Sequence, residues 1–399
     1  MEIRSITLFC PPDTPPARLA PFLSDARQAF TAPIQSLRLA TPPFPEWLPR
    51  DPEGAQAAAT ALAQDWQAVG MDYISLGPVL LRHDPGWLAL IPRLVGATGN
   101  LFAAGEMANG AGEIDFGRIH SLAALIQQLS RLYANGFGNL YFAALANCPP
   151  GCPYFPAAYH AGGPPHFALA VESADLAVTA VQGATDLAQA RAKLQKGIED
   201  SAENLTIPAR QLAARHNLTF SGLDFSLSPF PTAARSVGTA FTHLGIDYPG
   251  AAGSLFAAAF LTEALQRARF QRCGFNSLML PVLEDSALAE AAAAGRLSLS
   301  DLLSYSAVCG VGLDTVPLPG EVTIPQLSAI LADVAALAAR LNKPLTARLM
   351  PMPGKAAGDP VSFDFPYFAA GRVLPVSGAG LTGLLGAREP LTLHTLPSR

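Results

Sequence analysis

Residues 219–232 have the sequence Thr-Phe-Ser-Gly-Leu-Asp-Phe-Ser-Leu-Ser-Pro-Phe-Pro-Thr, and this stretch indicates how the chain is built. Its apolar run predicts a strand from Thr219 to Ser226, and the two prolines end it because proline lacks an amide proton for sheet pairing. An isolated aspartate is rare in strands and costly to bury alone. Asp224 is therefore expected to meet water, a cation or hydrogen-bond donors at the strand end. We take Asp224 as a catalytic candidate and Ser226 as a substrate-binding candidate.

Short apolar runs alternate with longer, alanine-rich amphipathic stretches along the rest of the chain. This alternation is typical of an α/β protein with mainly parallel strands. Further strands are predicted at 3–9, 73–76, 140–145, 167–171, 277–282 and 345–350, and helices at 54–69, 116–135, 186–216, 233–244, 254–269, 287–294, 300–305 and 324–342. Proline clusters at 11–21, 42–52 and 149–165 predict extended or turn-like surface loops. No composition break marks a linker, so residues 1–399 are expected to form a single domain.

The composition is typical of a globular protein whose partners are small molecules or proteins. Half of the 399 residues are hydrophobic and only 14% are charged, which is enough for a large core. The net charge of −5 comes without a basic cluster, which argues against a nucleic-acid partner. The N-terminus predicts a strand and not a signal peptide, and the apolar stretch 251–265 carries too many polar residues to span a membrane. We expect a cytoplasmic protein that binds a small-molecule ligand and no membrane, with a homo-oligomer left open.

The five cysteines are odd in number and dispersed, unlike the framework of a secreted disulfide protein. Cys148 and Cys152 have a spacing at which two thiolates share a zinc ion or form a redox pair, but no second pair completes a structural zinc site. Loop thiols, or one local disulfide, are the alternative that we favour, and a divalent metal ion stays open as a cofactor. Cys309 is expected to be buried, reduced and structural, because free cysteine is among the most buried residue types.

Three more polar groups in apolar surroundings are candidates for catalysis. His160 lies beside glycines, and its near-neutral pKa suits acid/base work or metal binding; a solvated loop histidine is the alternative. Glu172 follows a predicted strand and either faces Asp224 as a second carboxylate or begins the next helix. Asp314 follows a turn with two glycines and needs a partner there, either a functional group or the backbone.

Two cations near one strand end are candidates for binding an anion. Arg348 lies in the predicted strand 345–350, and Lys355 follows in a loop bounded by glycines. Together they are suited to hold a carboxylate or a phosphate, while a solvated lysine is an equally good account of Lys355. The spacing of a nucleotide phosphate loop is absent here, and the glycines of 310–312 do not extend to a dinucleotide fingerprint. No nucleotide cofactor is expected.

With these segments in order, the chain resembles the uncharacterised bacterial and archaeal family called domain of unknown function 711. The resemblance covers nearly the whole chain and rests on these segments: Ile3-Arg4-Ser5-Ile6-Thr7, Ile91-Pro92-Arg93, Tyr159-His160-Ala161-Gly162, residues 224–232, residues 310–314, Ala347-Arg348 and Pro353-Gly354-Lys355. It adds Arg93 to the substrate-binding candidates. The family's similarity to pyruvate formate-lyase-like proteins implies a ten-stranded α/β barrel with helices outside, made of two parallel half-barrels that lie antiparallel to each other.

Relatives of that fold include glycyl-radical enzymes, but this chain departs from their signature. In the segment 372–380, Pro375 stands where an arginine precedes the valine, and Ala379 stands where a tyrosine follows the glycine. No adjacent cysteine pair is available to relay a radical. Radical chemistry is therefore not expected.

Three functions remain open from the sequence. The first is an enzyme that acts on a small polar or anionic molecule in the barrel mouth, with Asp224 and His160 in acid/base or metal-assisted chemistry and Arg348 and Lys355 as an anion clamp. The second is a hydrolase of the glycosidase kind that uses two of the three candidate carboxylates. The third is a non-catalytic metabolite-binding or regulatory protein, for which the same cations would serve.

Overall fold

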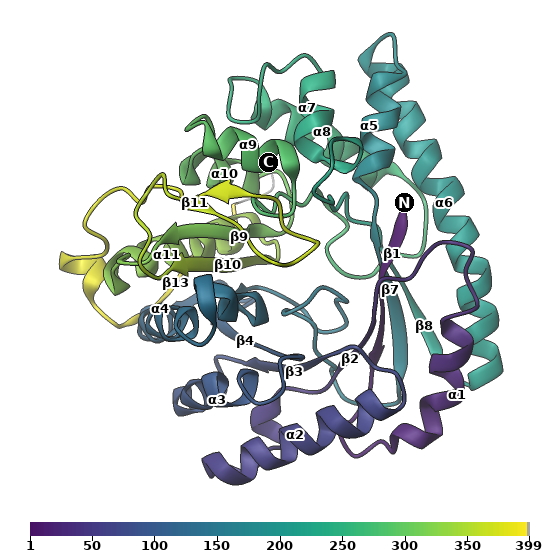
Figure 1. The fold of residues 1–399 in the computed structure, drawn as a ribbon, viewed down its shortest axis with the longest axis vertical. Helices are drawn as coiled ribbons and strands as arrows, with labels where there is room; N and C mark the ends of the chain where they lie inside the picture. The colour runs from purple at the N-terminus through teal and green to yellow at the C-terminus, as the bar shows by residue number, and fades with distance from the viewer. Residues whose placement is uncertain (397–399) are drawn as a thin grey trace.

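The computed structural model describes residues 1–396 and contains an eleven-stranded mixed sheet with helices along it (Figure 1). The strands of this sheet are β1 (Glu2–Phe9), β2 (Leu37–Ala40), β3 (Tyr73–Val79), β4 (Leu101–Ala108), β5 (Glu113–Asp115), β6 (Phe142–Ala146), β7 (His166–Glu172), β8 (Thr219–Asp224), β9 (Gly312–Pro319), β10 (Leu345–Met352) and β13 (Pro390–Thr392). A separate pair is formed by β11 (Pro360–Val361) and β12 (Gly371–Arg372). The predicted α/β class is confirmed.

In the sheet order β8-β7-β1-β2-β3-β4-β6-β10-β9, a central run of five parallel strands has a parallel pair at each end that points the other way. The central run is β1, β2, β3, β4 and β6; β7 with β8, and β10 with β9, point the other way. The two end strands are followed by isolated parallel bridges, which join Leu223 to Arg272, Leu227 to Leu278, and Pro281 to Asp314. The segment 272–281 thus contacts both ends of the sheet. The strand predicted at 277–282 forms only these bridges.

Helices cover the outer side of the sheet (Figure 1). They are α1 (Pro16–Ala26), α2 (Pro52–Ala68), α3 (Ile91–Val95), α4 (Phe116–Ser130), α5 (Ala174–Gln182), α6 (Leu187–His216), α7 (Val237–His243), α8 (Ser254–Arg267), α9 (Ser286–Ala293), α10 (Leu299–Ser306) and α11 (Ile324–Leu341). Among the described helices, α11 alone is long and apolar enough to cross a membrane. It packs here against α4 and β10 as a core helix, and a capping box at Thr323 begins it.

Two predictions from proline were wrong. The cluster at 11–21 is not all loop, because α1 begins at Pro16 and contains Pro21. Pro16 occupies the first turn, where a missing amide proton costs nothing, and Pro21 removes a single hydrogen bond from the helix. The segment 149–165 is not a surface loop, because residues 152–160 are buried. Its apolar side chains, among them Tyr154 and Ala157, pack on the inner face of the sheet.

The two faces of the sheet carry different side chains. In β2, Leu37 and Leu39 pack into the main core, whereas Arg38 points to the inner side. The pairing of β1 with β7 has a bulge between Ile3 and Ser5, and a bulge re-aims the side chain that it displaces. Arg4, at this bulge, also reaches the inner side. Charged groups thus collect around a cavity on this face of the sheet.

Candidate functional site

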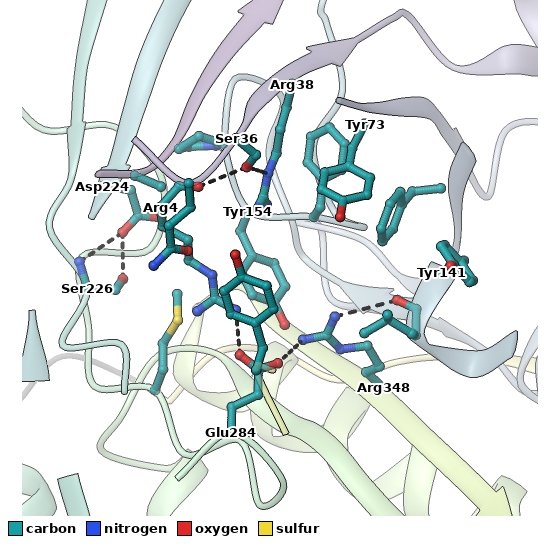
Figure 2. Close-up of a pocket in the computed structure, with 18 of the residues that line it drawn as sticks. Arg4, Ser36, Arg38, Tyr73, Tyr141, Tyr154, Asp224, Ser226, Glu284 and Arg348 are labelled. Atoms are coloured by element: carbon teal, nitrogen blue, oxygen red, sulfur yellow. Dashed lines mark hydrogen bonds and ion pairs between the residues drawn. The ribbon is translucent and has the colours of Figure 1, made fainter. Parts of the chain in front are cut away.

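A cavity of about 280 Å³ lies at one rim of the sheet. Because β7 and β8 are antiparallel to β1, the starts of β1 to β4 and the ends of β7 and β8 meet at this rim. Many elements contribute to its lining, which includes Arg4, Arg38, Tyr73, Tyr141, Asp224 and Arg348 (Figure 2). A concave pocket lined by apolar and aromatic side chains with a few convergent polar groups is typical of a ligand site, so this cavity is our candidate site.

The Glu284 carboxylate lies between the guanidinium groups of Arg4 and Arg348 (Figure 2). Arg348 Nη2 donates to Glu284 Oε1 at 3.0 Å, and Arg348 Nε donates to Asp314 Oδ1 at 2.6 Å. Arg348, Glu284 and Asp314 are buried, with side-chain exposures of 4%, 5% and 1%. Burial opposes the charged form of Arg348, but the two carboxylates outweigh it and raise its pKa. This network is an internally neutralised set of ion pairs.

Arg38 is placed differently in the same cavity. Its Nε donates to Ser36 Oγ at 2.9 Å, and its guanidinium lies over the rings of Phe155 and Tyr73, at 5.1 and 5.9 Å from their centroids. Within residues 1–396 it forms no ion pair with a carboxylate. Burial, together with the like charge of Arg4, lowers the pKa of Arg38 to about 10. Arg38 therefore stays charged at neutral pH, and its terminal N–H groups are open to a ligand.

Asp224 meets hydrogen-bond donors at the end of β8. Its Oδ1 accepts from Ser226 Oγ at 2.5 Å, from Ser226 N at 3.2 Å and from Asn276 N at 3.1 Å, and its Oδ2 accepts from Phe275 N at 3.0 Å. Burial raises the pKa of Asp224, and these hydrogen bonds oppose the rise. A Cβ atom at Gly274 would lie 2.4 Å from Oδ2, so a side chain there would collide with the carboxylate. Oδ2, with its single hydrogen bond, is the less saturated of the two oxygens.

Tyr154 brings a hydroxyl without a protein partner to the cavity. Its side chain is buried at 5% exposure, and its Oη forms no hydrogen bond to any of the described residues. The Arg348 guanidinium lies 5.8 Å from the ring centroid. Burial, and then the nearby carboxylates of Asp314 and Glu284, raise the pKa of Tyr154 well above its usual range, so the hydroxyl stays protonated. It is a hydrogen-bond donor with the Asp314 carboxylate close by.

Three of the predicted site residues line the cavity: Asp224, Ser226 and Arg348. Asp314 does not line it, but accepts a hydrogen bond from Arg348. Glu172 lies next to the cavity wall. It accepts from Gln35 at 2.8 Å and from Arg235 at 3.0 Å, and burial raises its pKa. Roles in chemistry for these residues stay predictions.

The other predicted residues lie away from this cavity. His160 is buried, its ring centroid is 5.2 Å from that of His166, and its Nε2 forms no hydrogen bond within residues 1–396. Lys355 Nζ donates to the carbonyl of Pro360 at 2.6 Å. Arg93, on α3, lies 3.8 Å from Glu53 at the surface. None of these three lines the cavity with Asp224.

Neither a metal site nor a disulfide is present in the described part of the chain. Residues 1–396 contain no group of three His, Cys, Asp or Glu side chains arranged to hold a metal ion. All five cysteines are free, including Cys148 and Cys152. Cys309 is buried, and burial raises its pKa to about 11, as suits a structural thiol.

The sequence interpretation missed four residues of this site: Arg4, Arg38, Tyr154 and Glu284. A signal existed for three of them, since each is a charged residue inside or just after an apolar run: Arg4 in 3–9, Arg38 in Leu-Arg-Leu-Ala, and Glu284 after Pro-Val-Leu. Tyr154 gave no such signal, because its proline-rich surroundings predict a surface loop.

These features define an α/β protein with a charged, aromatic-lined cavity at the rim of its sheet. Residues 15–365 match the family described as "Uncharacterised ACR (DUF711)", and the chain belongs to that family. It is 29% identical over 371 residues to the UPF0210 protein of Oleidesulfovibrio alaskensis. The aligned region covers 87% of this chain and 81% of that protein. It is 28% identical over 400 residues to the UPF0210 protein of Acetivibrio thermocellus, and this alignment covers 95% of this chain and 88% of that protein. The UPF0210 protein of Pyrobaculum arsenaticum is 35% identical over 228 residues, 55% and 50% of the two chains.

Proposed function

We propose that this protein is an enzyme that binds a small organic anion in the cavity and acts on it by acid/base chemistry. The observation that carries the proposal is the Arg38 guanidinium, which is charged and lines the cavity without a carboxylate partner among residues 1–396. Burying an unpaired cation is costly, and a bound anion would remove that cost. The planar guanidinium can hold a carboxylate by two parallel hydrogen bonds.

Two other groups supply the proposed chemistry. Asp224 Oδ2 accepts a proton from the bound molecule, since it has spare acceptor capacity and burial raises the pKa of its carboxyl. Tyr154 Oη donates a hydrogen bond to the oxygen on which negative charge develops, since it forms no full hydrogen bond among the described residues and turns to the ligand from the nearby Asp314 carboxylate. Arg348, whose Nε and Nη2 already bond Asp314 and Glu284, holds the cavity wall in place.

We also propose that the segment 272–281 closes the sheet into a ten-stranded barrel, with the cavity at its mouth. Two observations support closure. The segment forms parallel bridges with the end of β8 and with β9, which are the two ends of the sheet path. Counted with this segment, each of the two antiparallel runs has five members, as the resemblance to pyruvate formate-lyase-like proteins implies.

The functional proposal is tested by native mass spectrometry and turnover assays with pooled metabolites. Wild type is expected to retain a carboxylate-containing molecule that the Arg38→Gln variant loses. Arg50→Gln is the matched control, because Arg50 also lies over an aromatic ring, 5.6 Å from Trp87, but is 64% exposed at the surface. Asp224→Asn is expected to bind the molecule and leave it unconverted. Equal retention by wild type and Arg38→Gln would contradict the proposal.

A second candidate, non-catalytic binding, is favoured by one observation. Asp224 and Glu284 are already engaged by hydrogen bonds or ion pairs, and His160 does not line the cavity with them. If wild type and Asp224→Asn both release the bound molecule unchanged, this candidate replaces the enzyme. The carboxylate-pair hydrolase has less support, because only Asp224 among its three groups lines the cavity, while Glu172 and Asp314 are each bound by an arginine.

A further inference from the structure

Aromatic rings form a continuous wall on one side of the cavity, next to Arg38. The ring of Phe102 lies at its centre, with centroids 5.7 Å from Tyr73, 5.4 Å from Phe155 and 5.0 Å from Tyr141. Phe137 extends the wall to Phe365, whose ring is 5.3 Å away. These residues line the cavity from segments far apart in the chain, so the fold assembles the wall here.

We infer that the anion bound by this site is a single-ring aromatic carboxylate. The inference rests on the proposed anion-binding function and names its ligand class. Phe155 and Tyr73 lie beside the Arg38 guanidinium, so a carboxylate held by Arg38 enters between aromatic rings. A flat ring attached to that carboxylate would then pack edge-to-face or offset against the wall, the arrangements that aromatic pairs prefer.

The charges of the cavity favour one carboxylate over a phosphate. Arg4 and Arg348 are neutralised by Glu284, and Arg348 also by Asp314, so Arg38 is the guanidinium left to the ligand within the described residues. Asp224 and Asp364 also line the cavity, and their carboxylates oppose a second negative charge on the ligand. One planar guanidinium matches a monoanionic carboxylate, whereas a dianionic phosphate needs more positive charge. A small inorganic ion would also leave the aromatic wall without an apolar partner.

The size of the cavity fits one ring. A dry apolar cavity of roughly 150 Å³ binds benzene. This cavity of about 280 Å³ therefore has room for a ring, its carboxylate and one small substituent. Tyr154 Oη, buried and without a hydrogen bond to any of residues 1–396, is available to such a polar substituent.

The test is isothermal titration calorimetry of the full-length protein with five probes: benzoate, 4-hydroxybenzoate, cyclohexanecarboxylate, benzyl alcohol and inorganic phosphate. We expect benzoate to bind at least tenfold more tightly than cyclohexanecarboxylate, which has the charge without the flat ring, and than benzyl alcohol, which has the ring without the charge. 4-Hydroxybenzoate is expected to bind with an affinity equal to or higher than that of benzoate. Phosphate is expected to bind more weakly than either aromatic acid.

Protein variants locate the effect. Arg38→Gln is expected to weaken the binding of benzoate at least tenfold and to change the affinity for benzyl alcohol little. Arg50→Gln is expected to bind both probes as wild type does. Tyr73→Leu is expected to reduce the preference for benzoate over cyclohexanecarboxylate. Because the probe series is measured on wild type, the inference stays testable even if a variant does not fold.

The outcomes separate this inference from the proposed function. If cyclohexanecarboxylate or phosphate binds as tightly as benzoate and binding depends on Arg38, the aromatic class is wrong and the anion site stands. The same holds if aromatic acids fail but an aliphatic acid is retained through Arg38. If neither these probes nor any pooled metabolite depends on Arg38, both the inference and the proposed function are overturned.

Discussion

Each side of the cavity has a buried arginine, but the two arginines differ in whether a carboxylate neutralises them. On the side of β9 and β10, Arg348 donates to Asp314 and Glu284, and its charge is neutralised inside the protein. On the side of β2 to β4, Arg38 lies over aromatic rings and bonds only the hydroxyl of Ser36 among the described side chains. A buried cation with carboxylate partners belongs to the structure, whereas one without them is available to a ligand.

This contrast also explains which sequence-based assignment changed. Arg348 was expected to hold an anion together with Lys355, as two cations near one strand end, and Arg348 does line the cavity. Its Nε and Nη2 are engaged, however, and its Nη1 lies 3.5 Å from the carbonyl of Leu140. Arg38 keeps free donors beside the same space. In our proposal the anion therefore binds to Arg38 instead.

The largest effect is expected when the neutralised side is broken. Arg348→Gln would leave Asp314 and Glu284 without their main cation in a buried site, and removing one partner of a buried ion pair costs about 3–5 kcal/mol. Urea unfolding of the variant measures this loss. Arg82→Gln is the control, because Arg82 pairs with Glu46 at the exposed surface and should change stability by less than about 1 kcal/mol. Similar losses in the two variants would show that burial does not distinguish these pairs.

A smaller effect is expected where backbone donors, not a cation, hold a carboxylate. Gly274→Ala would place Cβ 2.4 Å from Asp224 Oδ2 and force alanine into a left-handed backbone at φ +73°. Gly354→Ala is a matched control, because Gly354 has φ +74° but no atom within 4 Å of its Cβ position. In the control, backbone strain alone should lower the free energy of unfolding by about 1–2 kcal/mol. Gly274→Ala should lower it by at least about 1 kcal/mol more. Equal losses in chemical denaturation would mean that Asp224 moves aside freely.

Local patterns predicted much of the fold because strands and helices depend on nearby residues. The apolar run at 3–9 became β1, and the amphipathic stretch 186–216 became α6. β2, with only four residues, and β4 gave signals too short or too mixed to be recognised. The prediction that the segment 149–165 lies at the surface was wrong for a different reason. Its prolines predict a loop, which is correct, but its apolar side chains decide that the loop is buried.

The site was harder to predict because its partners are distant in sequence. Asp224 was found from its apolar surroundings, since an isolated carboxylate in a strand needs partners. Nothing local shows that Arg348 meets Glu284, 64 residues away, or that the ring of Phe155 lies beside Arg38. Whether a buried arginine is paired depends on the sheet order. The sequence therefore predicted an arginine as the anion ligand, but could not indicate that Arg38, which our proposal uses, lacks a carboxylate partner among the described residues.

Histidine offers a third case in this comparison, because an imidazole can escape an unfavourable site by losing its proton. Burial, and then the neighbouring His160, lowers the pKa of His166 to about 4. The folded state therefore binds fewer protons than the unfolded state, and the stabilisation present above pH 6.5 is lost as pH falls toward 4. Since one pKa unit is worth about 1.4 kcal/mol and His166 is only partly buried, we expect a loss of about 1–2 kcal/mol.

Unfolding free energies measured from pH 7 to pH 4 test this expectation. His166→Gln should flatten the decline relative to wild type, while His243→Gln, at an exposed position, should leave its slope unchanged. If His166→Gln shows the wild-type slope, then other groups cause the acid sensitivity.

The smallest effect on stability is expected from Arg38→Gln, and this is the sharpest test of the comparison. The variant loses cation–π contacts worth about 0.5–2 kcal/mol, but it also removes the cost of burying a cation that has no carboxylate partner within residues 1–396. These terms oppose each other, so we expect the free energy of unfolding to change by less than about 1 kcal/mol in urea. A loss of about 3–5 kcal/mol, like that expected for Arg348→Gln, would mean that Arg38 is as structural as Arg348. The distinction between a neutralised side and a ligand-binding side of the cavity would then be wrong.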